Sequence, residues 1–383
     1  MKIDFSQIID NLEKEYIKVW QDICNIESPT SSKEDVDKVG KYVYDWASKL
    51  GFDVEILPVE NAGDVICITM NKDSAEKPIC FSGHMDTVHA KGIFDYPPTR
   101  VEDDIIYGPG VTDCKGGIVC AMFAMHTLKE CGFDKSPVML LVQSDEEMGS
   151  RPSKRKTINY ICEKAKDAVA FINLEGNGEY SKACISRKGI AGYIFKITGQ
   201  EAHSSESAIL GANAILEASH KIIELEKIKE DKGITINCGT IIGGTVPNTV
   251  PGYCEFKANI RFATNEQLEW VDEYVRKIAD TVYVDGCKCE VEKTGFRIMM
   301  EDCQRNRDLL DKINECLKAE SLPILSPQSR KGGSDAADVT SCNIPCIDSI
   351  GVVGGYIHSN KEWAYIDSLK LAAKRLVAIA KNI

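Results

Sequence analysis

The chain has 383 residues, 43% of them hydrophobic and 27% charged, which is typical of a soluble globular protein large enough for two domains. Its formal net charge is −12, with 58 acidic against 46 basic residues and no basic cluster, which excludes an ordinary nucleic-acid-binding protein. No apolar run reaches the ~18 residues that a membrane-spanning helix needs, so we expect no membrane association.

The N-terminal segment, residues 1–16, mixes acidic and basic residues with scattered apolar ones, a pattern that predicts an amphipathic helix. A signal peptide would instead have a basic start and an unbroken apolar stretch. The sixteen cysteines include no C-x-x-C pair, and many lie inside apolar runs. We therefore expect a cytoplasmic protein with reduced, buried thiols, and a cysteine nucleophile or zinc–thiolate site is the less favoured alternative.

The next part of the chain alternates short apolar runs with helical patterns, as α/β proteins with a parallel sheet do. The expected strands are residues 65–70, 79–81, 138–142 and 168–174. Apolar residues at helical spacing predict a helix over 116–131, and Gly132 follows where such a helix should end.

The pattern changes over residues 189–297. The expected elements there are strand 190–198, helix 211–227, strands 234–242 and 253–261, helix 266–280 and strand 287–293. This βαββαβ order is that of a ferredoxin-like domain. The α/β pattern then resumes with helix 308–320, strand 345–350 and helix 368–382. We therefore expect one domain built from residues 1–188 and 298–383, with a second domain, 189–297, inserted into it.

Carboxylates and imidazoles follow the predicted strands of the first domain. His84 and Asp86 follow the second strand, Glu146 and Glu147 the third, and Glu175 the fourth; His358 lies in a glycine-rich loop after 345–350, and Asp113 directly precedes the helix at 116. Ligands of an open parallel sheet bind beyond the carboxyl ends of its strands. We therefore expect these side chains to converge at one edge of the sheet.

Carboxylates gathered in this way repel one another unless a cation neutralises them. Two imidazoles and three carboxylates suit two zinc ions with one bridging carboxylate, and cobalt or manganese suits the same ligands. A single histidine after a strand is more often structural, and a lone Glu-Glu pair is usually solvated surface. The joint arrangement favours the metal interpretation.

Three blocks of sequence resemble the signatures of the zinc-dependent metallo-exopeptidases. They are residues 82–88 (Ser-Gly-His-Met-Asp-Thr-Val), 108–117 (Gly-Pro-Gly-Val-Thr-Asp-Cys-Lys-Gly-Gly) and 145–150 (Asp-Glu-Glu-Met-Gly-Ser). The family includes glutamate carboxypeptidase, aminoacylase, acetylornithine deacetylase and succinyl-diaminopimelate desuccinylase. The resemblance extends from Ser28 to His358 and includes residues 199–204 and 210–214 of the inserted domain.

This resemblance implies roles for the residues at the sheet edge. His84 and Glu175 would bind one zinc, Glu147 and His358 the other, and Asp113 would bridge the two. Asp86 would orient His84. Glu146 would be the general base that deprotonates a metal-bridged water and passes the proton to the leaving nitrogen.

The resemblance also implies substrate-side roles in and around the inserted domain, which would act as a lid and dimerise. His203 would stabilise the oxyanion across a dimer interface. Asn248 and Arg261 would bind the substrate carboxylate, and the backbone at Gly333 would line the pocket. In the glutamate carboxypeptidase branch, positions like Lys188 and Arg297 face the substrate, and solvated ion pairs on an acidic protein are the competing interpretation.

We therefore expect a homodimeric di-zinc hydrolase that cleaves an amide bond next to a free carboxylate in a peptide or N-acyl amino acid. Glu at position 175 and the Gly-Pro-Gly form before Asp113 favour the glutamate carboxypeptidase branch. An N-acyl-amino-acid deacylase of the acetylornithine deacetylase or succinyl-diaminopimelate desuccinylase type is the nearest alternative. A catalytically silent carboxylate-binding homologue is disfavoured, because Glu146, His203 and the metal ligands are all present.

Overall fold

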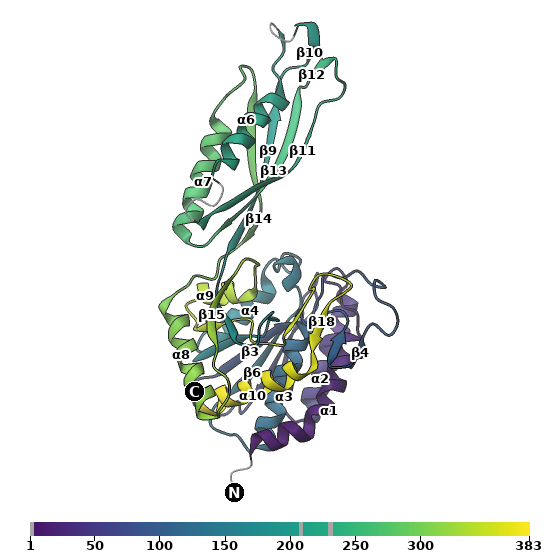
Figure 1. The fold of residues 1–383 in the computed structure, drawn as a ribbon, viewed down its shortest axis with the longest axis vertical. Coiled ribbons are helices and arrows are strands. Elements are labelled where there is room, and N and C mark those ends of the chain that lie inside the picture. Colours follow the sequence, from purple (N-terminus) through teal and green to yellow (C-terminus); the bar gives the residue numbers. More distant parts are fainter. Residues whose placement is uncertain (1–3, 207–209, 229–232) are drawn as a thin grey trace. The chain divides into compact units, whose positions relative to one another are not determined.

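The computed structural model describes residues 4–206, 210–228 and 233–383 (Figure 1). The chain forms two compact units. Unit 1 consists of Met1–Ser186, Asp302–Ser329 and Ser334–Ile383, and unit 2 of Arg187–Glu301 and Arg330–Gly333. Among the described residues, no helix combines the length and the apolar character needed to cross a membrane.

Unit 1 is built on a six-stranded sheet in the described part of the chain, with the order β1-β2-β6-β3-β7-β16. The strands are β1 (Asp53–Leu57), β2 (Val65–Met70), β3 (Ile79–His84), β6 (Val138–Gln143), β7 (Ala170–Asn173) and β16 (Cys346–Ile347). β3, β6, β7 and β16 are parallel, whereas β2 is antiparallel to both β1 and β6. β3 and β6 are buried along their whole length, because helices cover both faces of the sheet.

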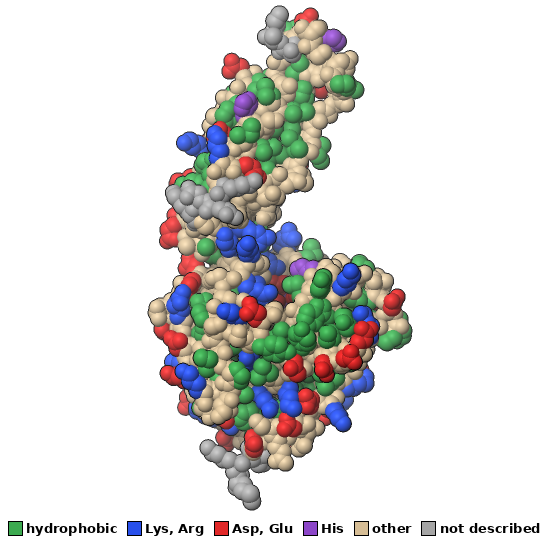
Figure 2. All heavy atoms as spheres, in the orientation of Figure 1, with side chains coloured by type: hydrophobic (Ala, Val, Ile, Leu, Met, Phe, Trp, Pro, Cys, Tyr) green, Lys and Arg blue, Asp and Glu red, His purple; other side chains and the backbone are tan. Residues whose placement is uncertain are grey.

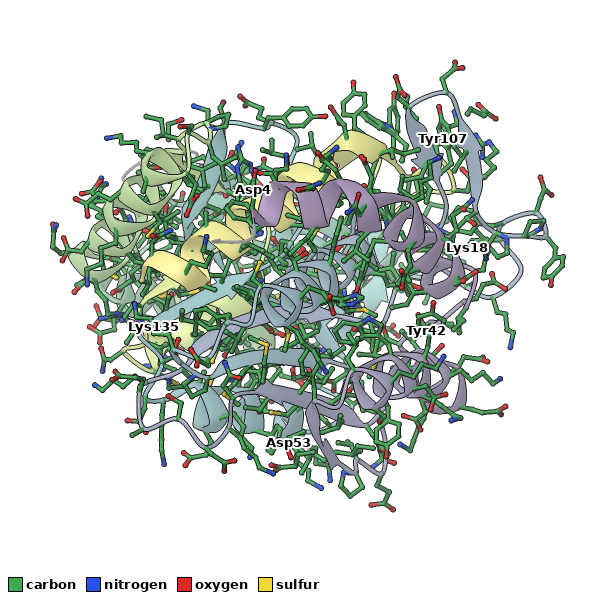
Figure 3. The ribbon with its side chains drawn as sticks, turned by 90° about the horizontal axis from the view of Figure 1, so that it is seen from below. Asp4, Lys18, Tyr42, Asp53, Tyr107 and Lys135 are labelled. Atoms are coloured by element: carbon green, nitrogen blue, oxygen red, sulfur yellow. The ribbon has the colours of Figure 1, made fainter. Side chains whose placement is uncertain are left out.

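One face of this sheet shares a hydrophobic core with α1 (Phe5–Cys24), α2 (Lys33–Lys49), α3 (Lys115–Glu130) and α10 (Ile366–Asn382). Alternate strand residues such as Ile66 and Leu140 enter this core, as the two-residue period of a strand requires. Figure 3 shows α1 with Lys18, α2 with Tyr42 and the edge strand β1 with Asp53. Acidic and basic side chains are interspersed over the visible face of unit 1 (Figure 2), so the acidic excess forms no single patch there.

Shorter elements complete unit 1. α4 (Lys156–Ala165) and α9 (Asp335–Ser341) pack against each other, α8 (Gln304–Ala319) packs against β16, and η1 (Glu146–Met148) follows β6. A four-stranded sheet has the order β17 (Gly354–Gly355), β18 (Trp363–Tyr365), β5 (Ile105–Tyr107) and β4 (Arg100–Glu102). β8 (Lys182–Arg187) pairs with β15 (Ser326–Arg330).

Unit 2 contains a four-stranded antiparallel sheet, again counted over described residues, in the order β11-β13-β9-β14. Its elements follow one another as β9 (Gly189–Thr198), α6 (Ala214–Glu226), β11 (Thr235–Gly243), β13 (Tyr253–Phe262), α7 (Asn265–Asp280) and β14 (Lys288–Arg297). Burial alternates along β9, because one face of the sheet packs on the two helices. β10 (Ala202–His203), η2 (Ser204–Glu206) and β12 (Thr249–Val250) lie outside this sheet.

The predicted fold class, a mainly parallel α/β domain with an inserted ferredoxin-like βαββαβ domain, is confirmed. Sequence analysis missed β1, because this edge strand is short and largely exposed and has no apolar run. It also placed the ends of the insertion at 189 and 297, whereas contacts assign Arg187, Lys188, residues 298–301 and residues 330–333 to unit 2.

The close approach of α3 to the strand ends yields a first prediction. A Cβ added to Gly117 would lie 2.0 Å from the carbonyl oxygen of Leu174, the residue before Glu175. Gly117→Ala should therefore lower the free energy of unfolding by roughly 1–3 kcal/mol, measured by thermal or urea denaturation. Gly178→Ala is the matched control, because nothing lies within 4 Å of a Cβ there. Equal stability of the two variants would contradict the close packing.

Candidate metal centre

Three neighbouring parallel strands bring most of the predicted site residues together. β6, β3 and β7 are adjacent, so their carboxyl ends meet at the same edge. His84 is the last residue of β3, Glu146 and Glu147 begin η1 after β6, and Glu175 follows β7. Two loops add Asp113, just before α3, and His358, between β17 and β18.

Asp113 lies between the two histidines. Its Oδ1 is 3.0 Å from His84 Nε2, and its Oδ2 is 3.0 Å from His358 Nε2. Each oxygen of one carboxylate thus faces a different imidazole nitrogen. This is the arrangement that a carboxylate bridging two metal ions requires.

The remaining carboxylates extend this pair into two groups. Glu175 Oε1 lies 3.6 Å from His84 Nε2, and Glu147 Oε2 lies 3.3 Å from His358 Nε2. Candidate ligand atoms of His84, Asp113 and Glu147 all lie within 4.8 Å of one another. Each group therefore offers one nitrogen and two carboxylates, counting Asp113 in both, which is the number of protein ligands that a catalytic zinc site has.

Cys114 places a thiol, a further candidate metal ligand, beside His84 and Glu175. Its Sγ lies 3.2 Å from the carbonyl oxygen of Leu174 and donates a hydrogen bond to it. The thiol is therefore already engaged with the backbone.

The carboxylates of this site perturb one another strongly. Burial raises the pKa of Glu147 to about 7, although a hydrogen bond from His358 opposes the shift. Burial and then the charge of Asp113 raise the pKa of Glu175 well above its usual value. Burial also acts to raise the pKa of Asp113, but hydrogen bonds from His358 and His84 outweigh it and the pKa is lowered. Hydrogen bonds to Asp113 and Glu147 raise the pKa of His358 to about 10.

These shifts show how the site balances its charge with protons alone. The histidines hold protons, and Glu147 and Glu175 are driven towards the neutral form, because several negative charges share a small buried volume. Divalent cations would replace these protons and leave every carboxylate ionised. The donor set therefore fits a pair of metal ions.

Asp86 fixes both His84 and the segment after β6. His84 Nδ1 lies 3.0 Å from the Asp86 carbonyl oxygen and 3.3 Å from its Oδ1, so Asp86 orients the ring with Nε2 facing Asp113. The carboxylate of Asp86 also accepts backbone hydrogen bonds from Glu146 and Glu147, both at 3.2 Å. Sequence analysis anticipated only the first of these contacts.

Glu146 is buried directly beside Glu147 in η1. Its negative charge adds to burial and to Asp113 in raising the pKa of both Glu147 and Glu175. Glu146 thus interacts electrostatically with one carboxylate of each candidate ligand group, as a general base for this site would have to.

Two predicted substrate-binding residues lie next to each other in unit 2. β10 pairs with β12, which places His203 opposite Thr249. The backbone N–H of Ser204 donates to the carbonyl oxygen of Asn248 at 3.0 Å. The exposed His203 ring contacts Ser205, with 2.8 Å between Nδ1 and Oγ.

Two of the three cations predicted to bind substrate share one face of the unit 2 sheet. Arg261 on β13 and Arg297 on β14 both pair with Ile190 of β9, one from each side. Lys188 stands two residues before Ile190, directly before the first residue of β9. Arg261 donates to the carbonyl oxygen of Lys331, and Lys188 Nζ donates to that of Gly233 at 2.6 Å.

Gly333 packs beneath one of these cations. A Cβ at this position would lie 2.7 Å from Arg297 Cδ. The neighbouring Arg187, which sequence analysis did not select, is buried and donates from Nη1 to the carbonyl oxygens of Gly332 and Gly333, at 3.1 and 3.3 Å. The segment 330–333 is thus held within unit 2.

Sequence analysis also missed Glu362, which is fully buried and bonded to His89. The feature of the sequence that could have pointed to Glu362 is its position four residues after His358. In the structure, His126 Nδ1 lies 3.0 Å from the hydroxyl of Tyr16, and His220 stacks on Tyr283.

Comparison with known proteins gives consistent results. The chain matches peptidase family M20/M25/M40 over residues 80–382. It is 30% identical to carboxypeptidase G2 from Pseudomonas sp. (strain RS-16), over 96% of this chain and 88% of that protein. It is 24% identical to acetylornithine deacetylase from Vibrio parahaemolyticus, over 82% and 88%. The crystal structure of aminopeptidase PepT from Bacillus cereus superposes with a TM-score of 0.82 at 21% identity, covering 97% and 98% of the two chains.

The protons on the candidate ligands predict a pH-dependent metal affinity. His358, with a pKa of about 10, is protonated at pH 8 in the metal-free protein, and Glu147 becomes protonated below about 7. Zinc must displace these protons, so its affinity should rise with pH, by roughly tenfold per unit for each proton displaced.

Calorimetric zinc titrations at pH 6 to 8, in buffers of different ionisation enthalpy, count the protons released. His358→Asn should reduce that number by about one at pH 8. An affinity that does not change over this pH range would contradict the proposed ligand set.

Proposed function

The chain belongs to peptidase family M20/M25/M40 and is a hydrolase, and on this premise we propose that it is a di-zinc carboxypeptidase of the glutamate carboxypeptidase type. It would cleave the amide bond next to a free C-terminal carboxylate. The observation that carries the proposal is the placement of Asp113 between His84 and His358 with Glu146 beside the same cluster. The relative named carboxypeptidase G2, matched over 96% of this chain, supports the substrate class.

Zinc held by His84, Glu175, Asp113, Glu147 and His358 would supply Lewis acidity and lower the pKa of a bound water to roughly 7. Glu146 would accept the proton of the attacking water and deliver it to the leaving nitrogen. Asp86 supports this role, because it holds the backbone N–H of Glu146 and so limits movement of the base. Cobalt or manganese would suit the same donors.

His203 would stabilise the negative charge on the carbonyl oxygen, in the site of a second copy of the chain. An exposed edge of unit 2 supports a homodimer. β11 is an edge strand of its sheet, and it exposes Ile241 and Ile242 to solvent; Leu216 and Ile223 on α6 are also exposed. Apolar side chains on an unpaired strand edge are typical of a surface that a partner covers.

The substrate carboxylate would be bound by Asn248 and Arg261. The guanidinium of arginine matches a carboxylate with two parallel hydrogen bonds. Arg297 shares a sheet face with Arg261, and Lys188 directly precedes β9 of the same sheet, which favours substrates with a second, side-chain carboxylate. Gly333 would line the pocket through its backbone.

The second candidate is an N-acyl-amino-acid deacylase. The similarity to acetylornithine deacetylase over 82% of the chain favours it, and its chemistry uses the same proposed residues. Turnover of acetyl- and succinyl-amino acids against peptides separates the two candidates. We also propose a cytoplasmic location, because all sixteen cysteines are free thiols, as expected in a reducing compartment.

The adjacent glutamates should respond differently to substitution. Glu146→Gln keeps the size of the side chain but cannot take up a proton, so it should keep two zinc ions per chain and lose about 10²- to 10⁴-fold in kcat. Glu147→Gln should instead weaken the binding of one ion. Elemental analysis and steady-state kinetics on both variants test this assignment, and identical behaviour of the pair would refute it.

Complementation tests the role of His203. His203→Ala and Glu146→Gln chains should each be inactive alone, and a mixture should recover part of the activity, because a mixed dimer contains one site with both residues intact. Each variant mixed with itself is the control. A fully active monomer in sedimentation experiments would rule out this arrangement.

The cationic face predicts a preference for acidic substrates. With one acyl group joined to glutamate, aspartate, leucine or arginine, kcat/KM should favour glutamate by roughly tenfold or more, because a buried charge pair contributes at least 1–2 kcal/mol. Arg297→Ala should abolish that preference without loss of zinc. An unchanged preference in the variant, or a wild type that prefers leucine, would overturn this part of the proposal.

A further inference from the structure

Glu362 is a buried carboxylate saturated with hydrogen bonds, and it lies in the same loop as His358. Its side chain has no exposed surface. Oε1 accepts from the backbone N–H groups of Thr112 at 2.8 Å and Asp113 at 2.9 Å. Oε2 accepts from the backbone N–H of Gly110 at 3.1 Å and lies 3.0 Å from His89 Nε2.

These four contacts join three segments of chain that carry candidate metal ligands. His89 lies five residues after His84 and packs edge-on against Phe94. Asp113 is in direct contact with Glu362, because its backbone N–H donates to the Glu362 carboxylate. His358 is four residues before Glu362, and the Glu362 N–H donates to the carbonyl oxygen of Ser359 at 3.2 Å.

The segment that carries Asp113 is held to the Glu362 loop at further points. The N–H of Gly108 donates to the carbonyl oxygen of Glu362 at 3.2 Å, and the hydroxyl of Thr112 donates to that of Trp363 at 2.6 Å. Trp20 Nε1 donates to the carbonyl oxygen of Val111 at 3.1 Å. Glu362 differs from these contacts because its one side chain reaches both the backbone N–H of Asp113 and the ring of His89.

We propose that Glu362 is a positioning residue that sets the spacing between Asp113, His84 and His358, and so the affinity of the centre for its two metal ions. The inference rests on the proposed di-metal function. Asp113 reaches towards both histidines at 3.0 Å, so a small shift of its backbone changes both distances at once. The hydrogen bonds of Glu362 go to backbone N–H groups and to His89, so Glu362 would act on the ligands through these groups.

Glu362→Gln tests this role. The amide keeps the size of the side chain, but its NH₂ group would face two N–H donors that now bind a carboxylate oxygen, so two hydrogen bonds are lost. Contacts of this kind behind metal ligands contribute about 10- to 100-fold to metal affinity, and we expect a loss in that range for zinc, measured by competition with a chromophoric chelator. The visible spectrum of the cobalt-loaded variant should also change, because the ligand geometry shifts.

Glu217→Gln is the matched control. Glu217 in unit 2 is equally buried, accepts from the backbone N–H groups of Tyr283 at 2.9 Å and Val284 at 2.7 Å, and pairs with Lys221. This variant should lower the melting temperature while leaving zinc affinity and the cobalt spectrum unchanged. A loss of zinc affinity in both variants would mean that global destabilisation explains the effect, and would overturn the inference.

His89→Phe provides a second test of the positioning role if Glu362→Gln fails to fold. It keeps a ring against Phe94 and removes one of the four donors, so zinc affinity should fall by about threefold or more in a folded protein. Unchanged affinity in His89→Phe, or in a folded Glu362→Gln, would overturn the positioning role while the wild type still binds two ions. A wild type that binds no zinc would instead contradict the proposed function itself.

Discussion

The structure of unit 1 depends on one electrostatic constraint, the concentration of carboxylates at a single sheet edge. Asp113, Glu147 and Glu175 lie within a few ångströms of two imidazoles in a largely buried site. Such a cluster is stable only if protons or cations compensate the charge. The raised pKa values of Glu147 and His358 correspond to compensation of the charge by protons. Bound metal ions would be the alternative way to compensate it. The repulsion between these carboxylates therefore lowers local stability, which is typical of a functional site.

Backbone N–H groups compensate the negative charge of two further buried carboxylates near the site. Asp86 and Glu362 accept five backbone hydrogen bonds between them, and neither is a candidate metal ligand. Each thereby fixes a segment that carries a candidate ligand or base: Asp86 holds Glu146 and Glu147, and Glu362 holds Asp113. A rigid frame matters because metal coordination tolerates only small errors in distance. The carboxylates of this unit thus divide between those that face the centre and those that hold the loops in place.

Unit 2 carries basic side chains on an antiparallel sheet, whereas the candidate metal centre of unit 1 gathers acidic side chains at the edge of parallel strands. The antiparallel sheet presents Arg261 and Arg297 on one face, Lys188 directly precedes β9 of that sheet, and the edge strand β11 exposes apolar side chains. Cations on a rigid sheet suit recognition of a carboxylate, because little side-chain and backbone freedom remains to be lost on binding. If the proposed roles of these cations hold, substrate preference would vary through unit 2 without a change in the candidate ligands of unit 1. Relatives of the chain include a carboxypeptidase and an acetylornithine deacetylase by name.

The sequence by itself determined the strands with long apolar runs, the βαββαβ order of the insertion and the identity of the polar residues that follow each strand. These features are local, since burial on both faces demands an apolar run and a helix demands its own spacing. Only the tertiary structure decided which residues meet. The antiparallel direction of β2, the edge strand β1, the second contact of Asp86 and the junction at Glu362 all depend on partners distant in sequence, 252 positions in the case of Gly110 and Glu362. A buried carboxylate surrounded by backbone N–H groups leaves no periodic signal, because its partners are groups that every residue except proline carries.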